Sequence, residues 1–168
     1  MLRICRRISD LDIGQLMAVY VQSNMQNGAL NYPDFSSDRQ LLEAEQDFYL
    51  FLKEFFTVSN AFYCVWAPDN TYQSALRLEP YQDGLLLEGL ETVPDGRRKG
   101  YAKNLLAETL AYVSTTFGCS IYSHIEKNNF PSRNLHISCG FVEITDYAAY
   151  IDGSIDFKSA TYKKGCSL

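Results

Sequence analysis

The sequence predicts an α/β (α+β) fold, a single domain over residues 1–168, in which helices flank a mixed and mainly antiparallel sheet. Three observations carry this prediction. Segments that alternate with the period of a strand are interspersed with segments of helical period. One apolar strand passes through a basic, glycine-containing loop directly into a helix. The chain then closes on two strand-like segments joined by a tight turn. Its length suits one domain with a sizeable core.

The first part of the chain is predicted to hold a strand, a helix and a polar loop. Residues 2–7 alternate as a strand does. Ser9, followed by Asp12, marks a helix start, and apolar residues then keep helical spacing to Tyr20. Residues 23–36 are polar and contain glycine and proline, so we expect a loop there.

A long helix and two strands are expected next. Ser37 and Gln40 form a second capping box, and one helical face from there to Phe55 is apolar. Residues 61–66 and 72–78 read as strands joined by a turn that contains proline, aspartate and asparagine. This arrangement predicts a hairpin at the centre of the chain.

The fourth predicted strand, residues 85–92, leads into the most informative stretch of the chain, which is Val93-Pro94-Asp95-Gly96-Arg97-Arg98-Lys99-Gly100-Tyr101-Ala102. A helix is expected from the end of this stretch to Phe117, where Gly118 stops it. The result is a strand, a basic loop and a helix in direct succession.

Such a loop is suited to binding an anion. The first N–H groups of a helix have no partner within it, and the helix dipole adds partial positive charge there. Arg97, Arg98 and Lys99 add full charges, Gly100 lets the backbone approach a ligand closely, and Ala102 keeps the first turn small. We therefore predict that the loop binds a phosphate-bearing cofactor. A basic loop that only caps a surface helix is the alternative.

The remaining chain completes the sheet. Residues 120–125 alternate as a strand, and a short helix follows with Pro131 in its first turn and Gly140 just past its end. Residues 141–151 and 155–163 are predicted to be antiparallel strands around an Asp-Gly turn.

A second motif lies in this region and narrows the identity of the cofactor. The patterns of a P-loop and of a dinucleotide-binding loop are absent. What the chain has is Arg97-x-x-Gly100-x-Ala102, and later Asn129 followed by Ser132, Leu135, His136 and Gly140-Phe141. These two motifs, in this order, resemble the GNAT acetyltransferase superfamily, whose loop consensus is Gln/Arg-x-x-Gly-x-Gly/Ala. The resemblance covers nearly the whole chain, although residues 1–60 match only in pattern.

The resemblance implies a GNAT-like sheet that splays between its fourth and fifth strands, with acetyl-CoA (coenzyme A) as cofactor. The pantetheine arm would lie in the splay and pair with the fourth strand like an added strand. The cofactor-binding residues implied in this way are Leu90, Thr92, Arg97, Arg98, Lys99, Gly100, Tyr101, Ala102, Asn129 and Ser132.

The implied activity is transfer of an acetyl group to a primary amine by direct attack in a ternary complex. The acceptor would be a small-molecule or peptide amine, and a homodimer is an open option since many relatives are dimers. In the family a Tyr usually stands where this chain has His136. Its absence keeps open a non-catalytic acyl-CoA-binding or sensing domain. A Cys–His enzyme using Cys119 or Cys139 is disfavoured because no oxyanion glycine motif accompanies either thiol.

His136 is the first candidate catalytic residue. Proton donation from a histidinium to the departing thiolate is downhill by roughly 2–3 kcal/mol, although only about a quarter of an unperturbed histidine is charged at pH 7. The alternative is a structural role in which His136 packs near the cofactor and bonds a backbone carbonyl.

The candidate bases are His124, Glu91 and Glu88. The resemblance to the family implies the backbone N–H near Thr92 as the oxyanion donor. Alternation along the fourth strand predicts that the two glutamates face opposite sides, so at most one points at the acceptor. His124 has the alternative of a strand histidine that faces solvent or is bonded in the core.

Composition excludes several classes. The net charge of −5 argues against a general nucleic-acid binder, and no apolar stretch approaches the length of a membrane span. The start of the chain has no apolar signal-peptide region. Five cysteines without a C-x-x-C spacing indicate reduced thiols, and so a cytoplasmic protein. No cluster of metal ligands is visible.

Overall fold

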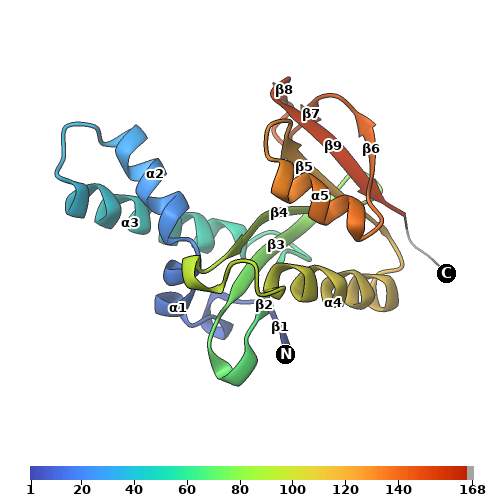
Figure 1. The fold of residues 1–168 in the computed structure, drawn as a ribbon, viewed down its shortest axis with the longest axis horizontal. Helices are drawn as coiled ribbons and strands as arrows, with labels where there is room; N and C mark the ends of the chain where they lie inside the picture. Colours follow the sequence, from blue (N-terminus) through green and yellow to red (C-terminus); the bar gives the residue numbers. More distant parts are fainter. Residues whose placement is uncertain (166–168) are drawn as a thin grey trace.

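The computed structural model describes residues 1–165 and is built on a seven-stranded sheet of order β1-β2-β3-β4-β5-β9-β6 (Figure 1). Neighbouring strands are antiparallel except β4 and β5, which are parallel. A separate pair, β7 and β8, is antiparallel. The strands are β1 Leu2–Cys5, β2 Phe62–Trp66, β3 Ser74–Tyr81, β4 Gly84–Thr92, β5 Ser120–Glu126, β6 Val142–Thr145, β7 Ala148–Ala149, β8 Ile155–Asp156 and β9 Ser159–Lys164. The predicted mixed, mainly antiparallel sheet is confirmed.

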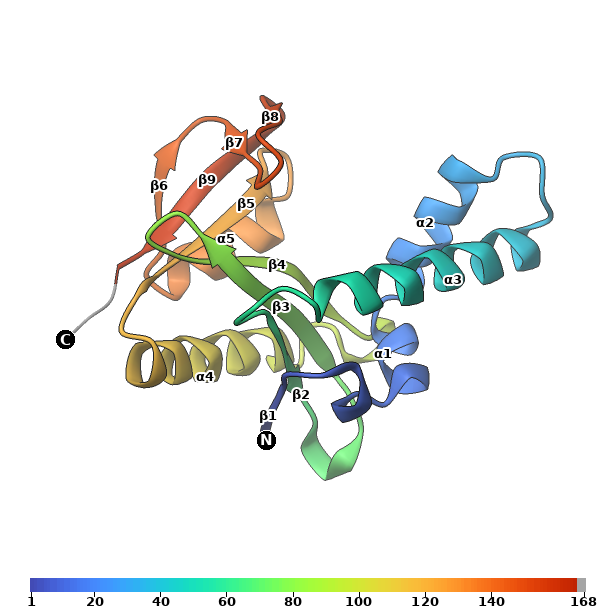
Figure 2. The same ribbon diagram turned by 180° about the vertical axis from the view of Figure 1, so that it is seen from behind.

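The helices cover both faces of this sheet. They are α1 Ile13–Val19, α2 Val21–Asn31, α3 Ser37–Phe55, α4 Tyr101–Thr116 and α5 Phe130–Ser138. Helix α4 lies against the central strands, and α2 and α3 form a hairpin that extends beyond the edge of the sheet (Figures 1 and 2). None of the helices within the described residues has the length and apolar character needed to cross a membrane.

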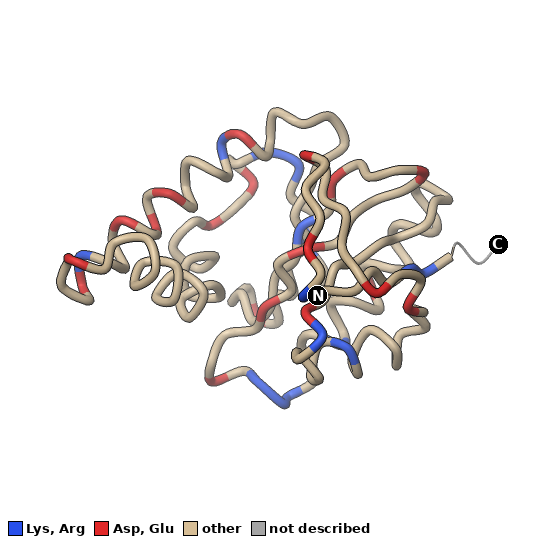
Figure 3. The backbone as a smooth tube through the Cα atoms, turned by 90° about the horizontal axis from the view of Figure 1, so that it is seen from above, with Lys and Arg blue, Asp and Glu red and all other residues tan. Residues whose placement is uncertain are grey.

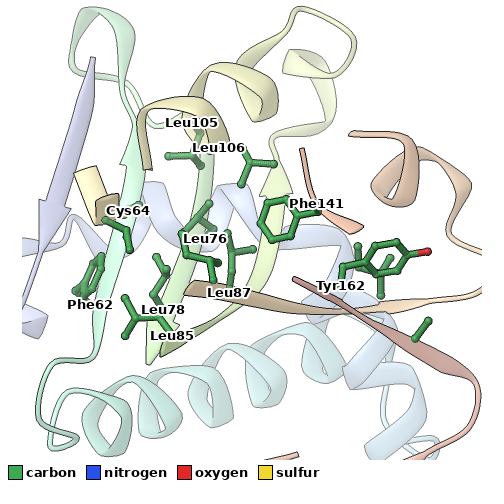
Figure 4. Packing of buried hydrophobic residues seen from close by; sticks show 14 residues of the cluster. Phe62, Cys64, Leu76, Leu78, Leu85, Leu87, Leu105, Leu106, Phe141 and Tyr162 are labelled. Atoms are coloured by element: carbon green, nitrogen blue, oxygen red, sulfur yellow. The ribbon is translucent and has the colours of Figure 1, made fainter. Parts of the chain in front are cut away.

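Two hydrophobic layers hold the sheet between its helices. On the α4 side, leucines of β3 and β4 pack against Leu105 and Leu106 (Figure 4). On the other side, Leu16 of α1 and Leu52 of α3 pack on the sheet. Strand β2 is buried on both faces, so its residues alternate between the two layers and read as a continuous apolar run.

Strands β4 and β5 separate soon after they start. Their parallel pairing covers only Gly84 to Leu87 of β4 and Ser120 to Ser123 of β5. Beyond that point β4 stays paired with β3, and β5 stays paired with β9. The splay between the fourth and fifth strands is therefore present.

A β-bulge lies in β4 at the splay. Ala75 pairs with Glu91 and Arg77 pairs with Glu88, so two steps along β3 oppose three steps along β4. Gly89 lies in the extra step and has φ +60°, in the left-handed region. Because Ala75 and Arg77 share a face, Glu88 and Glu91 share a face too. The prediction that they point to opposite sides is wrong, because the extra residue of the bulge interrupts the alternation between them.

The loop predicted over residues 23–36 is also wrong, because most of it is helix α2. Its glycine is a packing residue, as a Cβ at Gly28 would overlap the carbonyl oxygen of Gln40 in α3. Helix α2 has no charged side chain and buries only Asn24 and Gly28, so it lacks an apolar stripe that periodicity could detect. The acidic residues of the hairpin lie on α3 and its approach (Figure 3).

Both predicted capping boxes are displaced. Helix α1 starts after Asp12, whose side chain accepts a hydrogen bond from the Gln15 N–H at 3.0 Å. Helix α3 is preceded by Ser36 without a side-chain cap, and Gln40 instead donates to the Tyr32 carbonyl at 3.0 Å. The two predicted closing strands are four shorter ones, because β6 bulges where it pairs with β9 and the chain then turns into the β7–β8 pair.

The Gly28 contact yields a first prediction. Gly28→Ala should destabilise the protein by roughly 1–3 kcal/mol, since the added methyl meets backbone that cannot rotate away. Urea unfolding followed by circular dichroism measures this change. Gly14→Ala is the matched control, because Gly14 is also helical but its Cβ would have only an ordinary contact. The control should be neutral or stabilising by about 0.5–1 kcal/mol. Equal effects of the two substitutions would contradict the packing role.

Candidate functional site

A cavity of about 920 Å³ opens where β4 and β5 separate. Its walls are residues 87–92 of β4, residues 123–126 of β5, the start of α4, and α5. Helix α2 contributes a further wall. The cavity therefore combines strand edges, the N-terminus of a helix and a polar helix face in one continuous space.

The predicted site residues are brought together here with one exception. The catalytic candidates His136, His124 and Glu91 all line the cavity. The predicted cofactor residues that line it are Leu90, Thr92, Arg97, Arg98, Gly100, Tyr101, Ala102, Asn129 and Ser132. Lys99 does not line it, because it lies in the same loop but outside the cavity wall. Lys103, one turn into α4, lines the cavity and was not predicted.

The basic loop ends in an anion-binding helix start. Gly100 precedes α4 with φ +83°, a conformation that favours glycine, and its carbonyl accepts the first intrahelical hydrogen bond, from Asn104. The N–H groups of Tyr101, Ala102 and Lys103 come before that bond and have no partner within the helix. With the helix dipole they form a site for negative charge.

The bulge of β4 is held by polar contacts from neighbouring elements. Tyr20 of the α1–α2 junction donates its hydroxyl to the Gly89 carbonyl at 2.6 Å. Arg77 of β3 lies against Gly89 and forms an ion pair with Glu88 at 2.9 Å. Burial raises the pKa of the Tyr20 hydroxyl, which therefore stays a donor at neutral pH. The backbone groups of β4 that face the cavity beyond Leu87 have no strand partner.

The two carboxylates on this face have different surroundings. Glu88 is paired with Arg77. Glu91 accepts a hydrogen bond from the Ser23 hydroxyl of α2. Burial raises the pKa of Glu91, and this outweighs the opposing effects of Ser23 and the Arg97 charge.

His124 lies on β5 at the first position beyond the β4–β5 pairing. Its ring is edge-on to Tyr81 at 5.4 Å and to Tyr150 at 4.9 Å. Both ring nitrogens are buried and have no hydrogen-bond partner among residues 1–165. Burial lowers the pKa of His124, with the Glu88 charge opposing it, so the imidazole is neutral at neutral pH.

His136 is only 1% exposed and lies on α5, edge-on to Phe141. Its Nδ1 is 2.8 Å from the carbonyl oxygen of Ser132. A carbonyl only accepts, so the proton is on Nδ1 and Nε2 presents a lone pair. No group in the described chain bonds Nε2. Burial lowers the pKa of His136 and the Ser132 bond raises it by less, which leaves the ring neutral.

Asn129 caps helix α5, since its Oδ1 accepts a hydrogen bond from the Ser132 N–H at 3.2 Å. Its side-chain NH₂ is the part left for a ligand. Neither Cys119 nor Cys139 lines the cavity, so the structure does not favour a Cys–His enzyme. No disulfide joins Cys5, Cys64, Cys119 and Cys139, and Cys166 lies outside the described residues. Residues 1–165 also contain no group of three metal-ligating side chains.

Sequence reasoning missed that one part of the cavity wall is a helix. Gln22, Ser23 and Gln26 come from α2, which was predicted to be mostly loop. Tyr150 follows β7 and reaches the cavity only through the fold of the closing strands. A four-residue spacing from Gln22 to Gln26 was the one signal that a helix face could have given.

Comparison with known proteins adds an independent finding. The family model of the acetyltransferase (GNAT) family matches residues 29–141. No curated protein matches the chain. The PaiA N-acetyltransferase from Thermoplasma acidophilum, solved in complex with coenzyme A, superposes with a TM-score of 0.66 at 15% identity, covering 98% of this chain and 99% of that chain.

Two further solved structures are similar. The ribosomal-protein-S18-alanine N-acetyltransferase from Escherichia coli has a TM-score of 0.64 at 16% identity, covering 100% of this chain and 96% of that one. A putative streptothricin acetyltransferase from Bacillus anthracis, in complex with acetyl coenzyme A, has a TM-score of 0.54 at 14% identity over 68% of this chain and 67% of that one. At these identities the likeness shows a shared fold.

The Tyr20–Gly89 contact yields a second prediction. Tyr20→Phe should lower the free energy of unfolding by about 1–2 kcal/mol, because it leaves a buried carbonyl of the bulge without its donor. Chemical denaturation measures the loss. Tyr32→Phe serves as control, since its hydroxyl bonds Asp47 at an exposed position and its removal should change stability by less than about 0.5 kcal/mol. Equal free energies of unfolding for Tyr20→Phe and the wild type would show that Tyr20 does not stabilise the bulge.

Proposed function

The chain belongs to the acetyltransferase (GNAT) family, and we propose that it moves the acetyl group of acetyl-CoA to a primary amine by direct attack in a ternary complex. The observation that carries the proposal is the continuous cavity that joins the N-terminus of α4 to the unpaired edge of β4. An anion site beside a free strand edge suits a ligand with phosphates at one end and an amide-containing arm at the other.

The residues present fit coenzyme A. The N–H groups of Tyr101 and Ala102, with Arg97 and Arg98, would hold the pyrophosphate, and Lys103 would add charge beside it. The backbone at Leu90 and Thr92 would bond the pantetheine amides from one side. The Asn129 amide and Ser132 would bind the cofactor from the α5 side. Lys99 would contribute only to the general field of the loop.

A free backbone N–H at the bulge of β4 would polarise the thioester carbonyl. The bulge is suited to this because Tyr20 and Arg77 hold it in place, so little reorganisation is needed when charge develops on the oxygen. The amine would attack from the face of the sheet that carries Glu88 and Glu91, where side chains of α2 line the cavity.

His124 is the base we propose for the acceptor amine. It lies next to the point where the strands separate, it is neutral, and its nitrogens have no competing partner within the described chain. Glu91 is the second candidate, but its carboxylate is already bonded by Ser23. Glu88 is engaged by Arg77. A water between His124 and the amine would serve equally.

His136 is better suited to positioning than to donating a proton. Its lowered pKa makes the imidazolium scarce, and its Nδ1–H is committed to Ser132. The remaining lone pair on Nε2 can accept a hydrogen bond from the coenzyme A thiol or a pantetheine amide. Of the two roles considered from the sequence, this geometry supports the structural one. The leaving thiolate would then take its proton from water or from the attacking ammonium.

A non-catalytic acyl-CoA-binding domain is the second candidate function. The neutral His136 at the usual tyrosine position favours it. Release of free thiol from acetyl-CoA, measured over a broad amine panel, separates the two. Turnover with any amine supports the transferase. Tight binding of acetyl-CoA without thiol release from any acceptor supports the sensor.

The start of α4 yields a third prediction. Gly100→Ala should weaken coenzyme A binding about tenfold, because an alanine strains the left-handed conformation by roughly 1–2 kcal/mol and shifts the N–H groups that follow. Isothermal titration calorimetry measures the Kd. Gly118→Ala is the matched control, with φ +59° and open space around its Cβ but a position at the other end of α4. It should lose stability and keep the Kd. An unchanged Kd in Gly100→Ala would show that the loop does not take part in coenzyme A binding.

The base yields a fourth prediction. With His124 as base, kcat is full above its pKa and falls as the pH drops through a midpoint below 6.5. His124→Gln should lower kcat by roughly 100-fold and abolish this limb. Burial lowers the pKa of His124 and raises that of Glu91, so the two residues would give acidic limbs of the kcat–pH profile with similar midpoints. The midpoint alone therefore does not identify the base.

Substitutions at both positions identify the base. Glu91→Gln should retain the acidic limb of the kcat profile if His124 is the base. A limb that persists in His124→Gln and disappears in Glu91→Gln would transfer the role to Glu91.

A further inference from the structure

The cavity has opposite charges at its two ends. Arg97, Arg98 and Lys103 surround the N-terminus of α4. The far end, on β4 and β5, is lined by Glu88, His124, Glu126 and Tyr150. The proposed function uses the basic end for cofactor phosphates and His124 as the base. The proposed function gives no role to the other residues of the acidic end.

Glu126 is a free carboxylate within reach of the reacting centre. It lies two residues after His124 on β5, so both side chains project from the same face, about 7 Å apart. Its side chain is exposed and has no ion pair or hydrogen bond with other side chains in residues 1–165.

Two aromatic rings pack against His124, and that of Tyr150 lines the cavity. The Tyr81 hydroxyl donates to the Ala149 carbonyl at 2.5 Å, which fixes its ring against His124. Tyr150 packs on the other side of His124. Burial raises the pKa of the Tyr150 hydroxyl, the charges of Asp156, Glu88 and Glu126 raise it further, and a hydrogen bond with Ser159 opposes them. An ammonium group is bound well by carboxylates and aromatic rings together.

The buried nitrogens of His124 point to a ligand at this place. A neutral imidazole left without partners is costly in a buried site, and a polar ligand that bonds it removes that cost. The cation at this end is Arg77, and its guanidinium is already paired with Glu88. An acceptor with a carboxylate would therefore find negative charge and no unpaired arginine, whereas an acceptor with a second ammonium would find Glu126.

Building on the proposed function, we propose that the acceptor is a short aliphatic diamine, with its reacting amine at His124 and its second ammonium held by Glu126 beside Tyr150. A chain of three to five carbons spans the separation of the two residues along the strand. In the transfer, the reacting nitrogen forms its bond to the acetyl carbon, the carbon–sulfur bond breaks, the thiolate leaves on coenzyme A, and the proton lost by the nitrogen passes to His124. The second ammonium takes no part in bond formation.

Three four-carbon amines test the inference with chain length held constant. They are 1,4-diaminobutane, n-butylamine and 4-aminobutyrate, which carry a positive charge, no charge and a negative charge at the far end. Thiol release from acetyl-CoA gives kcat/KM for each. After a twofold correction for its two equivalent amines, the diamine should exceed butylamine by at least about tenfold, and 4-aminobutyrate should be the poorest.

Glu126→Gln should bring the corrected ratio of diamine to butylamine close to one. Glu108→Gln, on an exposed part of α4 and outside the cavity, is the matched control and should keep the ratio. Equal kcat/KM for the diamine and butylamine, or an unchanged ratio in Glu126→Gln, would overturn the diamine inference while leaving amine transfer intact. Binding of acetyl-CoA without thiol release from these amines or a broad amine panel would instead contradict the proposed function.

Discussion

The end of β4–β5 pairing after Leu87 and Ser123 is the constraint on which the site depends. If the parallel strands stayed paired, their facing N–H and C=O groups would hydrogen-bond to one another, and no cavity would form between them. Here β4 follows β3 through the bulge at Gly89 while β5 follows β9, so each strand keeps one partner and exposes its other edge. The exposed edges meet the N-terminus of α4 in the same space. A polar chain and an anion can therefore be bound together by backbone groups, with few side chains dedicated to either.

Burial brings the titratable groups of this space toward similar proton affinities. It lowers the pKa of His124 and His136 and raises that of Glu91. Histidines that are neutral do not repel an incoming ammonium, and a carboxylate with a raised pKa releases its proton less readily. The same removal from water that makes the cavity suitable for acyl transfer also reduces the difference in pKa between the candidate bases. This is why the identity of the base cannot be deduced from pKa directions alone.

The sequence was sufficient for the elements whose signal is local. The leucines of β3 and β4 and the start of α4 follow from period and glycine placement, and most of the residues predicted to bind the cofactor line the cavity. The errors arose where the signal is tertiary. Gly28 and Gln40 were taken as loop and cap, but each serves the contact between α2 and α3. The bulge that turns Glu88 and Glu91 to one face depends on how β3 pairs with β4, which alternation along one strand does not reveal.

Helix α2 contributes uncharged amide and hydroxyl side chains to one wall of the cavity, and Gly28 brings it into close contact with a backbone carbonyl of α3. The basic loop and the strand edges belong to the sheet and α4 instead. Apart from the contacts of Tyr20 with Gly89 and of Ser23 with Glu91, the two halves of the cavity lie on different elements. Changes along the α2–α3 hairpin would alter the shape and hydrogen bonding offered to an acceptor while the basic loop at the start of α4 stayed as it is. In evolutionary terms, substitutions in the hairpin would change the proposed acceptor choice without changing the proposed cofactor loop.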